Sequence, residues 1–318
     1  MSKRKDSAYV SGVIAVKEKK LLKDKLAKMC SMSGEEALRL LLDSGFGGDP
    51  SLDIEDLILA DEREIDAFIR EYAPTDEVEE YLLSPRDFHN AKAIVKARYL
   101  NTDPKPMLGG DGKFDHEEIA RLIEAGNTEK LGKELSAAIK EAQTILEGEN
   151  PSGAEVGFLF DKAQFAYLSR VLKKFGVCRK LLVRRVDMTN LLTYFRAENA
   201  EEAEKFFVDG GSLTKEKLAS VYGGEDAALK AFEKTDYNPF VKKLVASSGG
   251  GFMEAERMLE SFETDFFAEK PYELSGQGTF LYYIFRRRVE NENVRVVFVC
   301  LRAGLNEAEI KKRLRGKI

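Results

Sequence analysis

The segment of this sequence that comes nearest to a metal site is DGKFDHEE, at residues 111–118. If Gly112 takes the sixth position of a calcium-binding loop, Glu118 falls at the twelfth, where a bidentate carboxylate belongs. The first and third ligand positions then fall on Met107 and Gly109, which offer no side-chain oxygen. A turn followed by a helix with an aspartate cap explains the same residues better.

The glycine clusters of the chain do not form a nucleotide-binding loop. They lie at 109–110, 210–211 and 249–251. None of them fits the G-x-x-x-x-G-K-[ST] loop that cradles phosphates, and none fits the G-x-G-x-x-G turn of dinucleotide-binding proteins. We therefore predict that these glycines belong to linkers between helices.

The histidines and cysteines also lack the spacing of a reactive site. The two histidines, His89 and His116, are not spaced as metal ligands on a helix. Cys30, Cys178 and Cys300 are far apart and form no C-x-x-C pair. We predict no catalytic, cofactor-binding or metal-binding residue and no enzymatic activity. An active site assembled between domains from distant residues is the alternative.

Composition narrows the class of protein further. The 318 residues suffice for two or three domains, and 33% of them are charged. The net charge of −5 argues against a general nucleic-acid binder, which would be basic. No stretch approaches the roughly 18 consecutive apolar residues of a membrane span. An odd, scattered set of cysteines favours a reducing compartment, so we expect a cytosolic, helix-rich protein.

One motif with helical periodicity returns three times along the chain. Each copy opens with an acidic residue and has an asparagine three residues later. The copies read DFHNAKAIVKARYLN from Asp87, DMTNLLTYFRA from Asp187 and ENENVRVVFVCLR from Glu290. Their asparagines are Asn90, Asn190 and Asn293, spaced by 100 and 103 residues. Apolar residues at offsets of 3, 6 and 7 give each copy one apolar stripe, although Asn291 interrupts the third.

A second motif follows each copy of the first, in the same order. It combines a glycine, an apolar residue, a capping residue and a helix start. It reads GKFDHEEIARL at 112–122, GSLTKEKLASV at 211–221 and, in reduced form, GLNEAEI at 304–310. A period near one hundred residues is too long for a solenoid. We predict an all-α chain of three similar helical bundles, at residues 1–106, 107–208 and 209–318.

The repeated polar residues are predicted to be structural. An asparagine beside an apolar stripe commonly hydrogen-bonds a neighbouring backbone turn, which we favour over contact with a partner. SPRD at 84–87 fits a capping box that would account for Asp87, whereas Asp187 is expected inside a helix. We also expect one helix over 8–30 and a buried Phe195.

Five segments in collinear order resemble a known family. They are AYVSGVIAVKEKKLL, DFHNAKAIVKARYL, VDMTNLLTYFRA, FFVDGGSL and ENENVRVVFVCLRAGLNEAEIKKRL, and they extend over nearly the whole chain. Together they resemble the C subunit, also called the d subunit, of V-type and A-type ATPases, in its archaeal and bacterial form. The shorter final connector and Asn291 of the third copy depart from the family pattern.

The resemblance implies a funnel of three helical domains with pseudo-threefold symmetry. It implies a non-catalytic rotor adapter that transmits torque at the cytoplasmic face of the membrane. Its partners would be the central shaft subunits, of D and F type, and the membrane ring of proteolipid subunits. The adapter would bind neither nucleotide nor the transported ion. We also expect no cofactor and, from the net charge, no nucleic-acid partner. The alternative is a cytosolic helical scaffold unconnected to a rotary ATPase.

Overall fold

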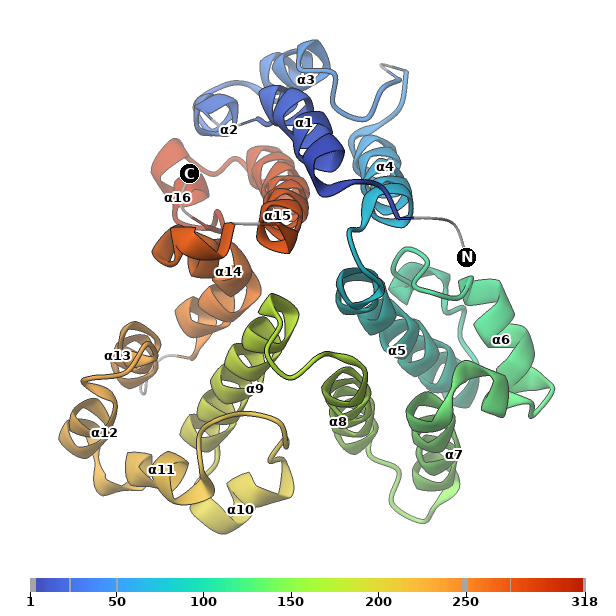
Figure 1. Ribbon diagram of the computed structural model, residues 1–318, viewed down its shortest axis with the longest axis vertical. Helices are drawn as coiled ribbons and strands as arrows, with labels where there is room; N and C mark the ends of the chain where they lie inside the picture. The colour runs from blue at the N-terminus through green and yellow to red at the C-terminus, as the bar shows by residue number, and fades with distance from the viewer. Residues whose placement is uncertain (1–3, 23, 50, 248–250, 275, 317–318) are drawn as a thin grey trace. The chain divides into compact units, whose positions relative to one another are not determined.

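The computed structural model describes residues 4–22, 24–49, 51–247, 251–274 and 276–316. All regular secondary structure in these ranges is helical, so the predicted all-α class is confirmed for them (Figure 1). Within the same ranges, no helix is both long enough and apolar enough to cross a lipid bilayer.

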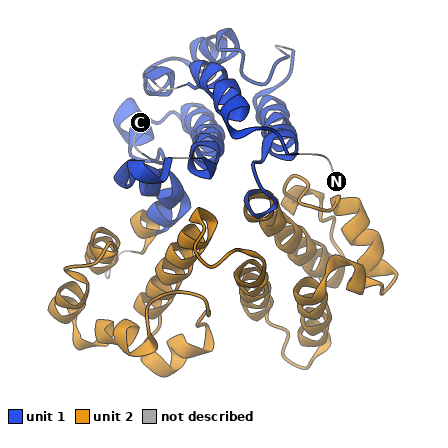
Figure 2. Ribbon diagram, viewed as in Figure 1, with its two compact units in different colours: residues 1–78, 256–318 blue, residues 79–255 orange. Residues whose placement is uncertain are grey.

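The chain divides into two compact units (Figure 2). Unit 1 combines Met1–Val78 with Glu256–Ile318, and unit 2 is the continuous segment Glu79–Ala255. The boundaries fall within α5 (Asp76–Leu100) and α14 (Met253–Glu269). Segments from near both ends of the described chain therefore belong to one compact unit.

Unit 1 has its core between the N-terminal helices and the last long helix. Its other helices are α1 (Ser7–Lys17), α2 (Asp24–Met29), α3 (Gly34–Asp43), α4 (Ile54–Tyr72), α15 (Gln277–Arg302) and α16 (Glu307–Lys311), with 3-10 turns at Glu18–Lys20 and Pro271–Leu274. Leu26 and Leu57 are buried in the same apolar cluster as Val294 and Phe298. Burial of this cluster therefore depends on segments at opposite ends of the sequence.

Unit 2 begins with most of α5 and continues through a series of shorter helices. These are α6 (His116–Glu124), α7 (Lys133–Glu147), α8 (Gly153–Val171), α9 (Val177–Arg196), α10 (Ala200–Lys205), α11 (Lys215–Ala219), α12 (Glu225–Phe232) and α13 (Asn238–Ala246), with 3-10 turns at Lys105–Met107, Thr128–Leu131 and Ser220–Gly223. One core within it joins Phe88 and Ile94 of α5 to Ile119 of α6 and Phe160 of α8. The division into three domains near residues 106 and 208 stays a prediction.

Side-chain caps begin the helices of the second motif as predicted. Asp115 accepts hydrogen bonds from the N–H groups of Glu117 and Glu118 in the first turn of α6, and Thr214 accepts one from the N–H of Lys217 in α11. Asn306 forms a full capping box with Glu309 at α16, and Ser33 forms one at α3. Each cap satisfies N–H groups that have no partner inside the helix.

Two helix boundaries differ from expectation. The predicted helix over 8–30 is interrupted, because α1 ends at Lys17 and α2 begins at Asp24. The break allows Leu21 and Leu22 to turn into the core, where both are buried. The predicted capping box at 84–87 is also wrong. Helix α5 continues through Pro85, and Ser84 donates to the carbonyl of Glu80 rather than capping a helix start.

The predicted burial of Phe195 is likewise only partly met. Tyr194 is completely buried, whereas Phe195 is half-buried. Leu191 and Tyr194 are three residues apart on α9 and share its inner face, so Phe195 lies at the flank of that face.

Candidate functional site

Each repeated asparagine holds the backbone of a turn downstream of its long helix. Asn90 accepts from the N–H of Gly109 at 2.9 Å and donates to the carbonyl of Gly110 at 3.2 Å. Asn190 bonds both the N–H and the carbonyl of Val208, at 2.9 and 2.8 Å. A side-chain amide used in this way replaces the two hydrogen bonds of a backbone neighbour.

Asn293 makes the same pair of bonds near the C-terminal end of the described chain. Its Oδ1 accepts from the N–H of Arg315 at 2.8 Å, and its Nδ2 donates to the Arg315 carbonyl at 3.0 Å. All three asparagines are at most 2% exposed. Val208 is buried, so without Asn190 its backbone groups would lack partners, which costs about 1–3 kcal/mol for each group. The backbone partners of Asn90 and Asn293 are only partly buried, so water can replace part of those bonds. We call these three arrangements the asparagine clamps.

The repeated aspartates bind the next part of the same connectors. Asp87 accepts from the N–H groups of Lys113 and Phe114, each at 3.1 Å. It lies inside α5 and is 3% exposed, so it serves tertiary structure rather than the helix start predicted for it. Its two carboxylate oxygens are well suited to adjacent backbone donors, since charge-assisted hydrogen bonds are the stronger kind.

Asp187 lies inside α9, as predicted, and is completely buried. It accepts from the N–H groups of Ser212 and Leu213 at 2.8 and 2.9 Å. The hydroxyls of Ser212 and Tyr237 donate to its other oxygen, at 2.6 and 2.5 Å. Four donors therefore surround one buried carboxylate, which satisfies its hydrogen-bonding capacity.

A glycine is required where each connector passes its aspartate. A Cβ atom added at Gly112 would lie 2.2 Å from Oδ1 of Asp87, and one at Gly211 would lie 2.2 Å from Oδ1 of Asp187. Both distances are far inside van der Waals contact. The sequence shows these glycines as parts of the second motif. Their spatial reason, close approach to the long helix, appears only in the structure.

Burial changes the titration of Asp87. Desolvation raises the pKa of this carboxyl to about 6, and the N–H groups of Phe114 and Lys113 oppose the rise. The nearby carboxylate of Glu80 adds to it, while the ammonium of Lys113 lowers it. The pKa is raised because the cost of removing the charged carboxylate from water exceeds the stabilisation that these hydrogen bonds give it.

Glu290, at the equivalent position of the third motif, has a different kind of partner. Its Oε1 accepts from the N–H of Leu22 at 2.9 Å. Leu22 precedes α2, so the donor comes from the N-terminal part of unit 1 and not from a connector downstream of the helix. In the third motif, the acidic residue therefore binds an N-terminal segment, whereas Asp87 and Asp187 bind the connector that follows their own helix.

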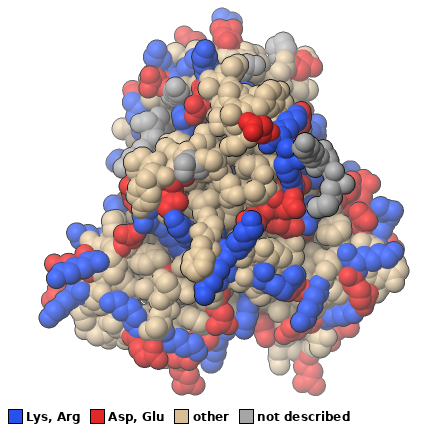
Figure 3. All heavy atoms as spheres, in the orientation of Figure 1, with Lys and Arg blue, Asp and Glu red and all other residues tan. Residues whose placement is uncertain are grey.

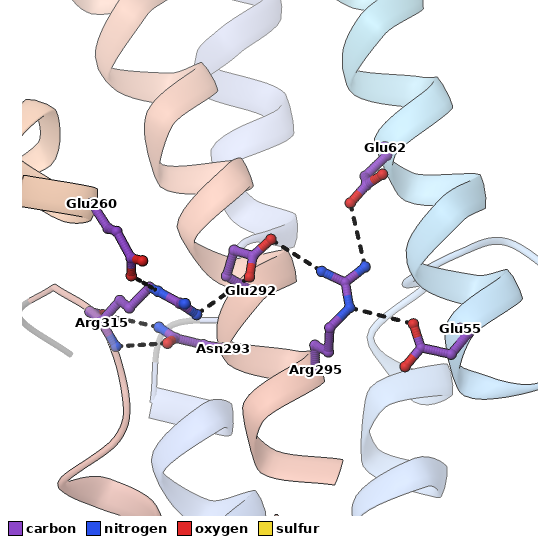
Figure 4. A network of polar contacts seen from close by, with 7 residues as sticks. All are labelled: Glu55, Glu62, Glu260, Glu292, Asn293, Arg295 and Arg315. Carbon is purple, nitrogen blue, oxygen red and sulfur yellow. Dashed lines mark hydrogen bonds and ion pairs between the residues drawn. The ribbon is translucent and has the colours of Figure 1, made fainter. Parts of the chain in front are cut away.

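Two arginines extend the polar contacts of α15 (Figure 4). Arg295 lies 3.0 Å from Glu292 on its own helix and 3.3 and 3.6 Å from Glu55 and Glu62 on α4. A guanidinium group presents five donors in one plane, so it can hold several carboxylates at once. This contact fixes the face that α15 presents to α4.

Arg315 makes the corresponding contacts on the other side of α15. Its side chain lies 2.6 Å from Glu260 of α14 and 3.3 Å from Glu292 (Figure 4). Its backbone is held by Asn293 at the same time. Partly exposed pairs of this kind contribute little singly, but a connected network restrains geometry.

Polar side chains also lie where α15 packs against α4, around Asn291. Asn291 is 2% exposed where the first two motifs have the apolar Phe88 and Met188. Nearby, the guanidinium of Arg287 is paired with Asp61 of α4. Burial raises the pKa of Asp61, and Arg287 opposes that shift. The interface of α4 with α15 is therefore partly ionic, which specifies alignment more than it adds stability.

The residues of the calcium-like segment do come together. Atoms of Asp111, Asp115 and His116 that could bind a metal lie within 4.8 Å of one another. Asp111 Oδ1 lies 2.7 Å from Nδ1 of His116, and Asp115 caps α6. His89 is placed elsewhere, with Nε2 2.9 Å from the carbonyl of Met107. Capping and these local hydrogen bonds account for the cluster.

Comparison with known proteins identifies the family. The family model described as ATP synthase (C/AC39) subunit matches residues 10–313. The chain belongs to this family of ATPase C subunits. The resemblance inferred from the five sequence segments is confirmed, and the match includes all three long helices that carry the clamps.

Curated members of the C-subunit family match most of the chain. The C subunit of the V-type sodium ATPase of Enterococcus hirae is 22% identical over 261 residues, which are 78% of this chain and 77% of that protein. The C subunit of the A-type ATP synthase of Haloquadratum walsbyi is 24% identical over 246 residues, 71% of each chain. That of Methanosarcina barkeri is 22% identical over 250 residues, 72% and 67% of the two chains.

Proposed function

We propose that this chain is the rotor adapter of a V/A-type rotary ATPase. It joins the central shaft of the ATP-processing head to the membrane ring of proteolipid subunits and transmits torque between them. It is a non-catalytic subunit of the complex. We place it at the cytoplasmic face of the membrane. The shaft partners are subunits of the D and F type. The chain itself binds neither nucleotide nor the transported ion.

The observation that carries this proposal is the family match over residues 10–313. Relatives matched over at least two thirds of both chains are named as C subunits of a V-type sodium ATPase and of A-type ATP synthases. A match of this extent includes both units, so it concerns the whole described fold and not one shared module.

The internal contacts suit a part that carries torque. A torsional load tends to slide helices and to pull connectors away from them. The asparagine clamps and the two aspartates tie connectors to α5, α9 and α15 through paired hydrogen bonds. Close-packed helical cores accommodate strain poorly, which makes them stiff. The proposed role needs such stiffness and no reactive group.

Surface charge supports polar contacts with several partners. On the face seen in Figure 3, acidic and basic side chains are interspersed and neither sign dominates. The net charge of −5 is small for 105 ionisable Lys, Arg, Asp and Glu residues, 50 basic and 55 acidic. Contacts assembled from mixed charges are weakened by salt, with a screening length of about 8 Å at physiological ionic strength.

The test is to compare ATP hydrolysis and ion pumping in membranes that lack this chain. We expect hydrolysis by the soluble head to persist while ATP-driven pumping disappears, because the adapter connects the two without performing either reaction. Re-adding the purified chain should restore pumping. Pumping at normal rates without the chain, or loss of all hydrolysis by the isolated head, would contradict the proposal.

A further inference from the structure

A groove of about 650 Å³ lies along α7 and α8 of unit 2. On α7 it extends from Glu134 to Ile145, a distance of ~16 Å at 1.5 Å per residue. On α8 its lining residues recur every three or four positions from Glu155 to Ala166. The groove therefore follows two helices over about three turns. This shape matches a helix better than a compact ligand.

Five alanines line the groove, together with larger apolar side chains. Ala137 of α7 and Ala166 of α8 are both exposed. Alanines let the backbone of another helix approach closely, and larger apolar side chains at one side give that helix a surface to pack against. That side is formed by Phe158 and Phe206, whose rings meet edge to face at 5.3 Å, and Phe206 is 38% exposed.

Acidic and basic side chains both line the groove: Glu134, at its far end, is already paired with Arg170, and four others are exposed. Glu141 and Glu155 lie toward the turn that joins α7 to α8, whereas Lys162 lies farther along α8. Lys205 adds a second positive charge beside Phe206. All four side chains are exposed, and none forms an ion pair within the part of the chain that the structure describes. They are available to a partner.

We propose that this groove binds an amphipathic helix of a neighbouring subunit of the same ATPase. The bound helix lays an apolar face of about three turns on the alanines and on Phe206. It carries a basic side chain opposite Glu141 and Glu155 and an acidic one opposite Lys162 and Lys205. The source of the partner rests on the proposed function, while the shape and charge of the site do not.

Cysteine labelling of the intact complex tests the proposal. The three native cysteines are buried, so a thiol introduced by Ala137→Cys or Ala166→Cys is the accessible one for a maleimide probe. We expect both variants to react rapidly in the isolated chain and at least tenfold more slowly in the purified ATPase. Thr144→Cys, exposed on α7 outside the groove, is the matched control and should react equally fast in both.

A bifunctional cross-linker at position 137 then identifies the occupant by mass spectrometry. The expected product joins position 137 to an amphipathic helix of another protein of the ATPase. A product that joins two copies of this chain, or equal labelling rates in the free chain and the complex, would overturn the inference. If the chain does not purify with the ATPase at all, the proposed function fails instead, so the two failures are distinguishable.

Charge reversal tests the electrostatic complementarity of the site. The double variant Lys162→Glu, Lys205→Glu should raise the Kd for rebinding to ATPase stripped of this chain about tenfold. Lys130→Glu with Lys133→Glu makes the same change in net charge at exposed positions outside the groove and should leave that Kd unchanged. An equal loss of affinity in both double variants would show a general charge effect and contradict the assigned contacts of Lys162 and Lys205.

Discussion

The N–H of Leu22 donates a hydrogen bond to Oε1 of Glu290 across 268 residues of sequence, at 2.9 Å. The two residues lie in unit 1, where the N-terminal helices and α15 share one apolar core. The bond places the segment between α1 and α2 against the last long helix. In the third motif this N-terminal segment therefore supplies the backbone donor that a downstream connector supplies in the first two.

We predict that Glu290→Ala lowers the free energy of unfolding by about 1.5–3 kcal/mol, the range for hydrogen bonds to charged groups. Glu290→Gln keeps an acceptor oxygen and should cost less. Urea unfolding measures both values. Hydrogen exchange at the Leu22 amide should accelerate in Glu290→Ala more than in Glu290→Gln. Unchanged exchange at this amide in both variants would mean that the bond does not hold the segment.

The connector glycines give a second prediction. Gly112→Ala forces a Cβ atom against Asp87 and should destabilise the chain by about 1–3 kcal/mol, as overpacking does. Gly109→Ala is the matched control in the same connector, because its nearest neighbours would lie 3.7 Å from the new atom. A denaturant melt should separate the two variants clearly. Equal stability would show that the connector moves freely away from α5.

Asp87 should make stability depend on pH in a defined window. Its folded pKa of about 6 exceeds the ordinary 3.8, so the folded state binds more protons than the unfolded state between these values. Stability contributed by this group is therefore lost as pH rises from about 4 to 6. The loss is up to about 3 kcal/mol, at 1.36 kcal/mol per pKa unit.

Asp87→Asn removes the titrating group, so the difference in unfolding free energy between wild type and variant should change across that window. Urea unfolding at intervals between pH 4 and 7 measures it. The wild type should lose stability relative to the variant as pH rises. A difference that stays constant over the window would show that the carboxyl titrates normally.

The three asparagine clamps make the same number of backbone hydrogen bonds but differ in the burial of their partners. We expect Asn190→Ala to lower the free energy of unfolding by about 2–6 kcal/mol, since it leaves two buried backbone groups of Val208 unpaired at about 1–3 kcal/mol each. Asn90→Ala and Asn293→Ala should cost less, because their backbone partners are only partly buried. Chemical denaturation of the three variants measures this. An equal or smaller cost for Asn190→Ala than for the other two would contradict this order.

The helical architecture was largely predictable from local sequence. The caps Asp115, Thr214 and Asn306 appear in the sequence because a helix start needs a short polar side chain at one defined position. Helix α4 could be predicted from its periodicity, since its apolar residues recur on one face. The recurrence of Asn90, Asn190 and Asn293 was equally visible, because the spacing is a property of the chain alone.

Only the tertiary structure decided what these residues bind. Asp87 had a plausible local explanation as a cap, yet it bonds Lys113 and Phe114, because its place within α5 leaves its carboxylate facing the connector. The break between α1 and α2 could not be predicted either. Helix propensity favours continuation there, and burial of Leu21 and Leu22 overrides it.

The sequence by itself determined the helical class, the caps of the second motif, the repeated polar positions and the family, because these depend on neighbours along the chain or on collinear order. The tertiary structure decided that Glu290 meets Leu22, that Gly112 lies against Asp87 and that α7 and α8 form a groove. Contacts of this kind depend on how helices pack, and packing brings together residues whose separation in sequence carries no sign of their proximity.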